Sequence, residues 1–295
     1  MLFQVPGIAK HEGKSYKFEA VHFQGSPLQV QAQAVNELEI GDHGYSSFVF
    51  GVVNAGMHLR IIADELQDGV PGFYSNQYLV RNGSSIKRIE DLKGKVVAVN
   101  IKGSASDIPM RAMLRKHGLT DSDFTLIEAP LPAQPAMLAE HKIDLASEPL
   151  PFTAEPEVLA NDHPLFLQRD IFGISPLAFW AARTSWLEKN RAAVVDFLED
   201  ALRVERWYLD PAHHKEAVAI ASKVGKEPPA FYDRWLFVKN GENGDYYRDP
   251  RGLPNIDSIQ KTVDLQKSLG FSHSTIDVAK YTDLSYIREA AARLK

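Results

Sequence analysis

A short polar turn at residues 102–106 has the composition of an anion-binding site. Its sequence is Lys102-Gly103-Ser104-Ala105-Ser106, and it follows a β-branched run at 95–100 that predicts a buried strand. A helix is predicted after the turn, with Ser104 or Ser106 as its N-cap. Backbone N–H groups at such a helix start bind small anions, and the Lys102 ammonium group would add positive charge. A plain strand-to-helix loop with good caps would contain the same residues, so both interpretations stay open.

Two upstream segments also place polar and aromatic side chains beside predicted strands. Tyr45-Ser46-Ser47 combines a ring with two hydroxyl groups, which suits stacking and hydrogen bonding of a small ligand. These serines could instead cap a helix, with Tyr45 packed at an edge. Ser26 opens a predicted helix, and Tyr74 and Gln77 lie in the polar first half of a predicted strand.

Two ionisable residues are candidates for acid–base chemistry. Glu148 follows a strand predicted at 142–147 and precedes Phe152, so it is either a functional carboxylate or the partner of a surface lysine. His43 stands beside Asp42, and the two could form an acid–base pair. A buried histidine with satisfied hydrogen bonds is the alternative interpretation.

Several chemistries are excluded or disfavoured by missing residue types. The chain has no cysteine, no His-Glu-x-x-His and no Gly-x-Ser-x-Gly. Disulfides, thiolate catalysis and cysteine-bound metals are therefore excluded. We expect no metal site and no cofactor.

The candidate residues need a framework of alternating strands and helices. Up to about residue 180 the sequence alternates strand and helix patterns, beginning with a strand at 17–23, which predicts an α/β fold with largely parallel sheets. The remaining third is helical, with Ser185-Trp186-Leu187-Glu188 as a capping box at its start. The length of 295 residues allows one large or two medium domains.

Charge and hydropathy restrict the partners. The formal net charge is −5 and no Lys/Arg block is present, which argues against nucleic acid. No apolar run approaches the roughly 20 residues that a membrane span needs. Residues 1–6 lack the basic and apolar regions of a signal peptide, so we expect either a cytosolic protein or a chain whose leader is absent.

The segment IEDLKGKVVAVNIKGSAS at 89–106 resembles a feature of a known family. It is similar to the start of the second lobe in bacterial ABC-transporter substrate-binding proteins of the nitrate/sulfonate/taurine and thiamine-precursor type, which carry a DLKGK-strand-GS sequence there. Segments 9–13, 36–42 and 143–149 resemble other parts of the same family. The resemblance covers most of residues 5–180.

This resemblance implies a two-lobe periplasmic-binding-protein fold, with two mainly parallel sheets flanked by helices and a hinge of two crossings. The crossings are expected near Leu79–Asn82 and Pro176–Phe179. Lobe one would comprise 1–80 plus 178–295, and lobe two 81–177. The family's first strand and signal peptide are missing from this chain.

The implied function is capture of a small anionic or aromatic organic molecule between the lobes, for delivery to an ABC permease. We expect a periplasmic monomer that is not an enzyme and binds no nucleic acid. The expected ligand-binding residues are Ser26, Tyr45, Ser46, Ser47, Tyr74, Gln77, Lys102, Gly103, Ser104, Ser106, Glu148 and Phe152.

An enzyme on the same fold is the alternative. It would act on an aromatic acid in the manner of a decarboxylase, with His43 and Glu148 as acid and base. The family's pyrimidine synthases carry a cysteine cluster, which this sequence lacks.

Overall fold

Two groups of strands form the framework of the protein. The computed structural model describes residues 4–238 and 244–294. The first sheet has the order β1 (Ile40–His43), β8 (Ser175–Arg183) and β2 (Leu59–Asp68). The second has the order β6 (Ala146–Glu148), β3 (Gln77–Arg81) and β7 (Asp162–Leu167). A pair formed by β4 (Val96–Val99) and β5 (Thr125–Glu128) adjoins it through a bridge between Val97 and Leu145.

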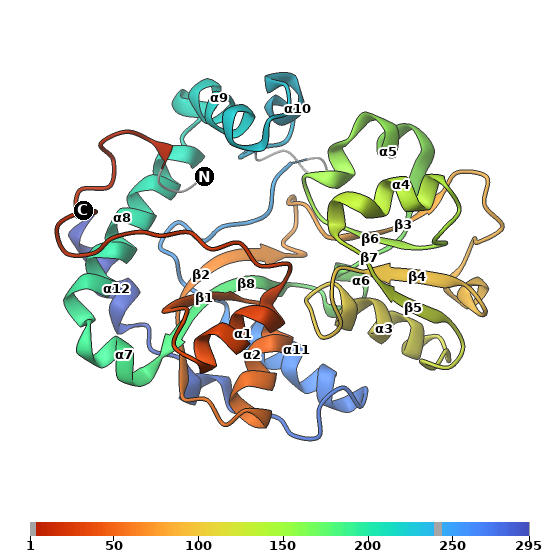
Figure 1. Ribbon diagram of the computed structural model, residues 1–295, viewed down its shortest axis with the longest axis horizontal. Coiled ribbons are helices and arrows are strands. Elements are labelled where there is room, and N and C mark those ends of the chain that lie inside the picture. Colours follow the sequence, from red (N-terminus) through yellow and green to blue (C-terminus); the bar gives the residue numbers. More distant parts are fainter. Residues whose placement is uncertain (1–3, 239–243, 295) are drawn as a thin grey trace.

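Helices cover both sheets, and Figure 1 shows the two resulting lobes side by side. In chain order the first six helices are α1 (Ser26–Ala34), α2 (Tyr45–Val49), α3 (Asp107–Lys116), α4 (Gln134–Ala139), α5 (Pro156–Asn161) and α6 (Arg169–Phe172). The others are α7 (Thr184–Lys189), α8 (Arg191–Leu209), α9 (His214–Gly225), α10 (Pro229–Asp233), α11 (Ile256–Ser268) and α12 (Ser285–Arg293).

The predicted α/β class with two lobes is confirmed, but the strand directions differ from the prediction. β8 runs antiparallel to both β1 and β2, and β3 runs antiparallel to both β6 and β7. β4 and β5 are parallel. β3 and β8 are the central strands of their sheets, and each begins where the chain has just crossed from the other lobe. They therefore enter their sheets in the direction opposite to that of their neighbours.

The strand predicted at 17–23 does not form. This segment is irregular, and most of its side chains are exposed. Its alternating pattern has no neighbouring strand to pair with, and Phe18 instead stacks on Phe197 of α8 with ring centroids 6.3 Å apart.

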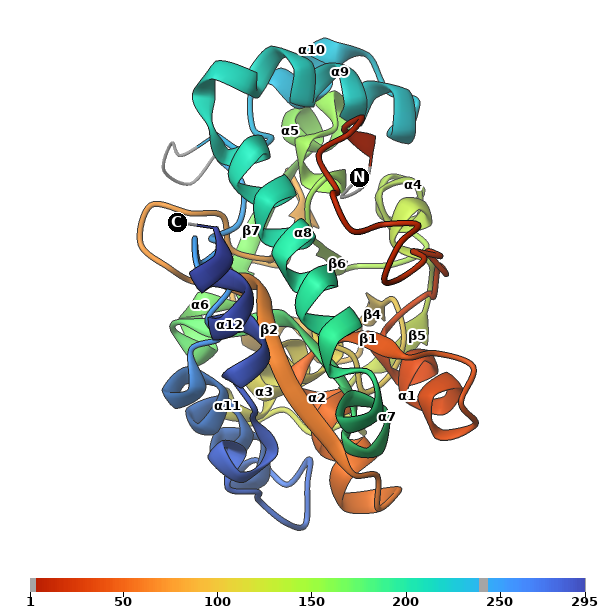
Figure 2. The same ribbon diagram turned by 90° about the vertical axis from the view of Figure 1, so that its left-hand side faces the viewer.

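Both faces of the first sheet are buried, because successive side chains of a strand point to opposite faces. Ile61 packs in the cluster with α2 and α11, while Ile62 packs in the cluster with α8 and α12. Figure 2 shows α8 crossing one face of this lobe beside α12. The second lobe is built alike, with Val97 facing α3 and Ala98 facing α4.

The two chain crossings between the sheets lie side by side. The Asp68 carboxylate accepts hydrogen bonds from Ser75 Oγ (3.0 Å) and from the Asn76 N–H (2.9 Å). Asn76 Nδ2 donates to Gln168 Oε1 (3.0 Å), and the Gln168 N–H donates to the Asn76 carbonyl (2.9 Å). These bonds tie the segment after β2 to the segment before β8.

Strand pairing bears on the predicted lobe division. β3 begins at Gln77, before the predicted boundary at residue 81, and pairs within the second sheet. β8 begins before the predicted boundary at residue 178 and pairs within the first sheet. We therefore propose that the crossings are the segments 69–76 and 168–174, and that lobe two lies between them.

The helical last third is not confined to lobe one. α9 and α10 contact residues 150–154 of the second lobe, where Ala154 packs with Phe231 and Trp235. Arg234 Nη2 donates to the Ala154 carbonyl at 3.0 Å. These helices therefore connect the lobes at the top of Figure 1.

Candidate functional site

The turns singled out in the sequence meet where the lobes contact each other. Ser46 Oγ of lobe one donates to the Gly103 carbonyl of lobe two at 2.7 Å, and Ser47 Oγ approaches the same oxygen at 3.4 Å. The Gly44 N–H donates to Ser26 Oγ at 3.1 Å. Folding thus brings the 26, 44–47 and 102–106 turns together, as expected for two halves of one site.

Backbone N–H groups of the predicted anion-binding turn at 102–106, the anion cradle, are already bonded to the protein's own side chains. The Gly103 N–H donates to Asp107 Oδ2 and the Lys102 N–H donates to Glu128 Oε1, each at 2.7 Å. Ser104 Oγ accepts from the N–H groups of Ser106 (3.3 Å) and Asp107 (3.2 Å), so Ser104 binds the start of α3, whose N-cap residue is Ser106. In this conformation an anion would lie beside the turn and contact side chains rather than these N–H groups.

The other serines and Tyr45 support the local structure. Ser104 Oγ and Ser106 Oγ both donate to Asn100 Oδ1, at 2.7 and 3.2 Å. Tyr45 is fully buried and packs edge-on against Phe172 with centroids 5.6 Å apart. Tyr45 therefore lies in the core, as in the structural interpretation of its motif.

The remaining predicted residues cluster at the start of β3 and the end of β6. Tyr74 Oη donates to Thr153 Oγ1 (2.7 Å) and to the Glu148 carbonyl (3.3 Å). Gln77 pairs with Glu148 across the sheet. Phe152 lies in the following turn and is half-buried.

Glu148 and His43 lie in different lobes. Glu148 is 1% exposed, and both carboxylate oxygens lack a hydrogen-bond partner among the described residues. Burial, with Glu155 and Asp162 nearby, raises the pKa of Glu148 to about 9. His43 Nε2 lies 2.7 Å from Gln33 Oε1, and burial lowers the pKa of His43 to about 4. His43 is thus buried as in the structural interpretation, but only Nε2 is bonded, and Nδ1 has no hydrogen-bond partner among the described residues.

A basic cavity of about 480 Å³ lies between α1, α2 and α11 of lobe one and α3 of lobe two. Its wall contains Lys102, Arg111, Arg115 and His273, and the described part of the wall contains no carboxylate. Arg111 is held by Asp107 and Asp121, and Arg115 lies over the Phe271 ring at 3.9 Å. Polar groups complete the wall: Gln31, Ser46, Ser47, Asn54, Gly103 and Gln266.

The sequence analysis missed the arginines and Gln266 of this cavity. Arg111 and Arg115 are spaced to share one face of a helix, which was a usable signal. Gln266 comes from α11, far along the chain, and its Oε1 is buried without a hydrogen-bond partner among the described residues. No local pattern indicated that it would face α3.

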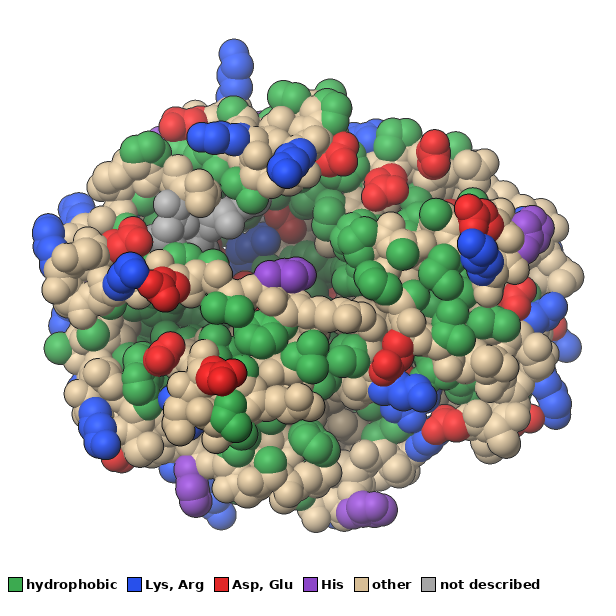
Figure 3. Space-filling view, in the orientation of Figure 1, with side chains coloured by type: hydrophobic (Ala, Val, Ile, Leu, Met, Phe, Trp, Pro, Cys, Tyr) green, Lys and Arg blue, Asp and Glu red, His purple; other side chains and the backbone are tan. Residues whose placement is uncertain are grey.

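A second, acidic cavity of about 300 Å³ lies on the other side of the lobe contact, below α9 and α10. Its wall combines Asp64, Glu65, Glu205 and Asp245 with a group of aromatic rings, and Leu150 contributes from lobe two. Figure 3 shows a hollow at the centre of this face with acidic and basic side chains inside it. The sequence analysis missed this cavity because its residues come from separate elements.

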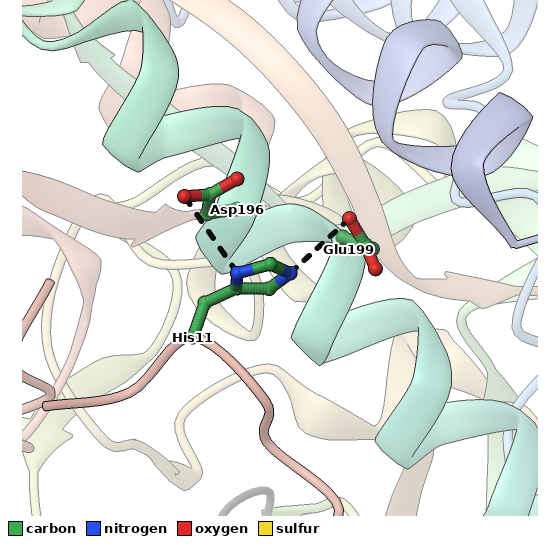
Figure 4. A group of neighbouring side chains, drawn as sticks. All are labelled: His11, Asp196 and Glu199. Carbon is green, nitrogen blue, oxygen red and sulfur yellow. Dashed lines mark ion pairs between the residues drawn. The ribbon is translucent and has the colours of Figure 1, made fainter. Parts of the chain in front are cut away.

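One cluster among the described residues has the geometry to hold a metal ion. Figure 4 shows His11 between Asp196 and Glu199 of α8, at 3.8 and 3.4 Å. Arg293 pairs with both carboxylates, and Arg203 also pairs with Glu199. Because two guanidinium groups already neutralise these carboxylates, the cluster works as an ion-pair network that fixes the N-terminal segment to α8.

The two sheets, the paired crossings and the interlobe cavities define a two-lobe solute-binding fold. A model of the NMT1-like family matches residues 5–222, and the chain belongs to that family. Within the described residues, no helix has the length and apolarity to cross a membrane.

Curated and solved relatives share this architecture. A Bacillus subtilis (strain 168) protein named for binding aliphatic sulfonates is 24% identical over 279 residues, covering 95% of this chain and 80% of its own. The alkanesulfonate-binding protein SsuA from Xanthomonas axonopodis pv. citri, solved with MOPS, is 19% identical, with a TM-score of 0.70 and coverage of 90% and 87%. The periplasmic nitrate-binding protein NrtA from Synechocystis PCC 6803 is 15% identical, with a TM-score of 0.71 and coverage of 94% and 80%.

An enzyme also has this fold. The desulfurization enzyme DSZB is 12% identical with a TM-score of 0.59, covering 87% of this chain and 86% of its own. The fold alone therefore does not separate binding from catalysis.

Proposed function

We propose that this protein is the solute-binding component of an ABC importer, and that it holds a small organic anion in the basic cavity. The observation that carries the proposal is a cavity with walls from both lobes, containing three Lys/Arg side chains and no carboxylate among its described residues. A sulfonate or carboxylate group matches that charge. The names of the sulfonate- and nitrate-binding relatives support the same ligand class.

Direct contact with the anion is assigned to Lys102, Ser46 and Ser47, with Arg111 and Arg115 as further charge. Lys102 is exposed and borders the cavity. The arginines are already held in place by Asp107, Asp121 and Phe271, so they offer their remaining N–H groups at little conformational cost.

The other residues in the expected set would hold the surrounding structure in place rather than contact the anion. Ser26, Ser104 and Ser106 fix the turns beside the cavity, and their own contact with the solute stays a prediction. The same holds for Tyr74, Gln77, Glu148 and Phe152, which lie nearer to the acidic cavity.

Binding would be coupled to closure of the lobes. A solute in the basic cavity touches α2 from one lobe and α3 from the other only when the lobes are together. It therefore shifts the open–closed equilibrium toward the closed form, which the permease would recognise. A periplasmic location and action as a monomer belong to the same proposal.

The proposal contains no catalytic step. His43 and Glu148, the acid–base candidates, belong to different lobes, and neither is among the residues that line the two cavities. Recovery of unaltered ligand after incubation with the protein tests this part.

The test is a thermal-shift screen of alkanesulfonates, aromatic sulfonates, aromatic carboxylates and nitrate, followed by calorimetry on any hit. A bound anion should raise the melting temperature, because it stabilises only the folded form. Lys102→Ala should weaken binding about tenfold, which corresponds to about 1.4 kcal/mol.

Lys116→Ala is the matched control, since Lys116 is exposed at the end of α3 and does not border the cavity. If Lys102→Ala and Lys116→Ala bind the anion equally well, the basic cavity is not its site. If no anion binds, the proposed ligand class is wrong.

A further inference from the structure

We propose that the acidic cavity is a separate binding site for a small organic cation, an ammonium group carried on an apolar body. The proposal goes beyond the solute site described above. It rests on the acidic side chains and the aromatic rings that line one cavity.

Acidic side chains outnumber basic ones in the wall of the cavity. Asp245 pairs with the lining residue Arg248 at 3.1 Å. Asp64, Glu65 and Glu205 also line the cavity, and none of them forms an ion pair with a Lys or Arg of the described residues. Glu65 Oε2 accepts a hydrogen bond from Trp180 Nε1 at 2.8 Å. Asp42 lies against the Glu65 carboxyl group, and burial together with Glu65 raises the pKa of Asp42.

Aromatic rings form much of the remaining wall. Trp180, Tyr208, Trp235, Phe237 and Tyr246 all border the cavity. The faces of such rings attract ammonium groups, most strongly where water is excluded. Carboxylates together with several rings are the combination that binds an organic cation, whereas an anion would be repelled by both.

Two deeply buried polar atoms at this cavity lack partners. Asp64 is 6% exposed, and its Oδ1 has no hydrogen-bond partner among the described residues, although Oδ2 accepts from Gln67 at 2.9 Å. Trp235 is 7% exposed, and its Nε1 likewise has no acceptor among the described residues. Buried polar groups are normally satisfied. Neither atom is exposed on the cavity surface, so a ligand there would contact the other acidic groups and the rings of the wall.

The volume and the position of the acidic cavity suit a ligand of metabolite size. A volume of about 300 Å³ is at the lower end of the range for ligand cavities. Most of the wall comes from lobe one and the helical third, and Leu150 from lobe two closes one side. The basic cavity shares none of these lining residues, so the two ligands need not compete.

Proton linkage gives the site a diagnostic pH dependence. Burial raises the pKa of Glu205 to about 8 and that of Asp64 to about 7. The groups around Glu205 are the carboxylates of Asp64, Glu65 and Asp249, which raise its pKa, and the Arg248 guanidinium, which lowers it. A bound cation favours the ionised carboxylates, so cation affinity should rise as pH increases from 6 to 9. Binding of an anion here would have the opposite dependence.

The experiment uses calorimetry and tryptophan fluorescence with phenethylamine, choline and tetramethylammonium as probes at several pH values. At least one probe should bind, with an affinity that increases tenfold or more between pH 6 and 9, and should change the fluorescence. Glu205→Gln should reduce the affinity about tenfold and flatten the pH dependence. Trp235→Phe should weaken each probe that binds, because a phenyl ring attracts an ammonium group less strongly than an indole ring does.

Glu188→Gln is the matched control, because Glu188 is an exposed carboxylate on α7. Thermal unfolding verifies that each variant is folded. The assignment is overturned if no cation binds at pH 8.5, if Glu205→Gln and Glu188→Gln bind alike, or if a bound cation competes with a bound sulfonate. Sulfonate binding in the same preparation bears only on the proposed importer function, so the two results are separable.

Discussion

Buried carboxyl groups are the most informative single residues in this protein. Asp64, Glu148 and Glu205 all have a pKa raised by burial, and all lie in the region where β2, β6 and α8 approach the lobe junction. An ionised carboxylate is costly in such surroundings unless a partner compensates it. Asp64 and Glu205 border a cavity that a cation could fill, whereas Glu148 does not.

Glu148 should make stability depend on pH. Its folded pKa of about 9 exceeds its ordinary value of 4.5, so the folded form retains a proton that the unfolded chain loses. The free energy of unfolding should therefore fall as pH rises from about 5 to 9. Glu148→Gln should match the wild type at pH 5 and be more stable by roughly 4 kcal/mol at pH 8, since each pH unit in this range contributes about 1.4 kcal/mol.

Urea denaturation at the two pH values measures this difference. Glu157→Gln, an exposed position on α5, should show no comparable change. Equal stability of Glu148→Gln and wild type at pH 8 would contradict the assignment of a protonated Glu148.

Among the elements, α8 organises lobe one because it contacts both the sheet and the N-terminal segment. Its fully buried Asp200 accepts hydrogen bonds from the N–H groups of Lys10 (2.9 Å) and His11 (2.7 Å) and from Tyr16 Oη (2.9 Å). Arg203 also donates to Asp200. One carboxylate thus fixes residues 10–16 to α8.

Asp200→Ala should release this segment. It leaves two backbone N–H groups and a hydroxyl without their acceptor, so we expect a loss of about 3 kcal/mol in the free energy of unfolding. Hydrogen exchange should accelerate at residues 10–16 in particular. Asp196→Ala removes only partly exposed ion pairs with His11 and Arg293 and should cost about 1 kcal/mol or less. Equal effects of the two variants would refute the special role of Asp200.

At the scale of the whole molecule, the two crossings determine how the lobes are placed. Gly69 follows β2, and a Cβ added to it would lie 2.1 Å from the carbonyl oxygen of Gly173 in the other crossing. Gly69 also has a positive φ of 77°. The close approach of the crossings therefore requires glycine at this position.

Gly69→Ala and Gly72→Ala separate these two effects. Gly72 has a similar φ of 86°, but nothing lies within 4 Å of its added Cβ. Gly72→Ala should cost about 1 kcal/mol from the backbone alone. Gly69→Ala should cost roughly 2 kcal/mol more, since the crossings must move apart. Urea denaturation measures stability and small-angle scattering measures lobe separation. Equal losses, with unchanged scattering, would show that the contact with Gly173 is unimportant.

The sequence by itself determined the features that depend on local pattern. Hydrophobic period and helix caps predicted the α/β class, the helical last third and the strand-to-helix turn at 102–106. The DLKGK segment indicated the family that residues 5–222 confirm. The convergence of the 26, 44–47 and 102–106 turns was expected only from the resemblance to a two-lobe family.

Only the tertiary structure decided the strand directions, the residues that line the cavities and the bonding of the N–H groups in the 102–106 turn. β8 runs against β1 and β2 because of where it re-enters lobe one, which no local pattern encodes. Glu128 accepts from the Lys102 N–H across 26 positions of sequence, and Glu205 approaches Asp64 across many more. Local periodicity sets which face of an element is apolar, but only long-range packing sets which polar groups meet.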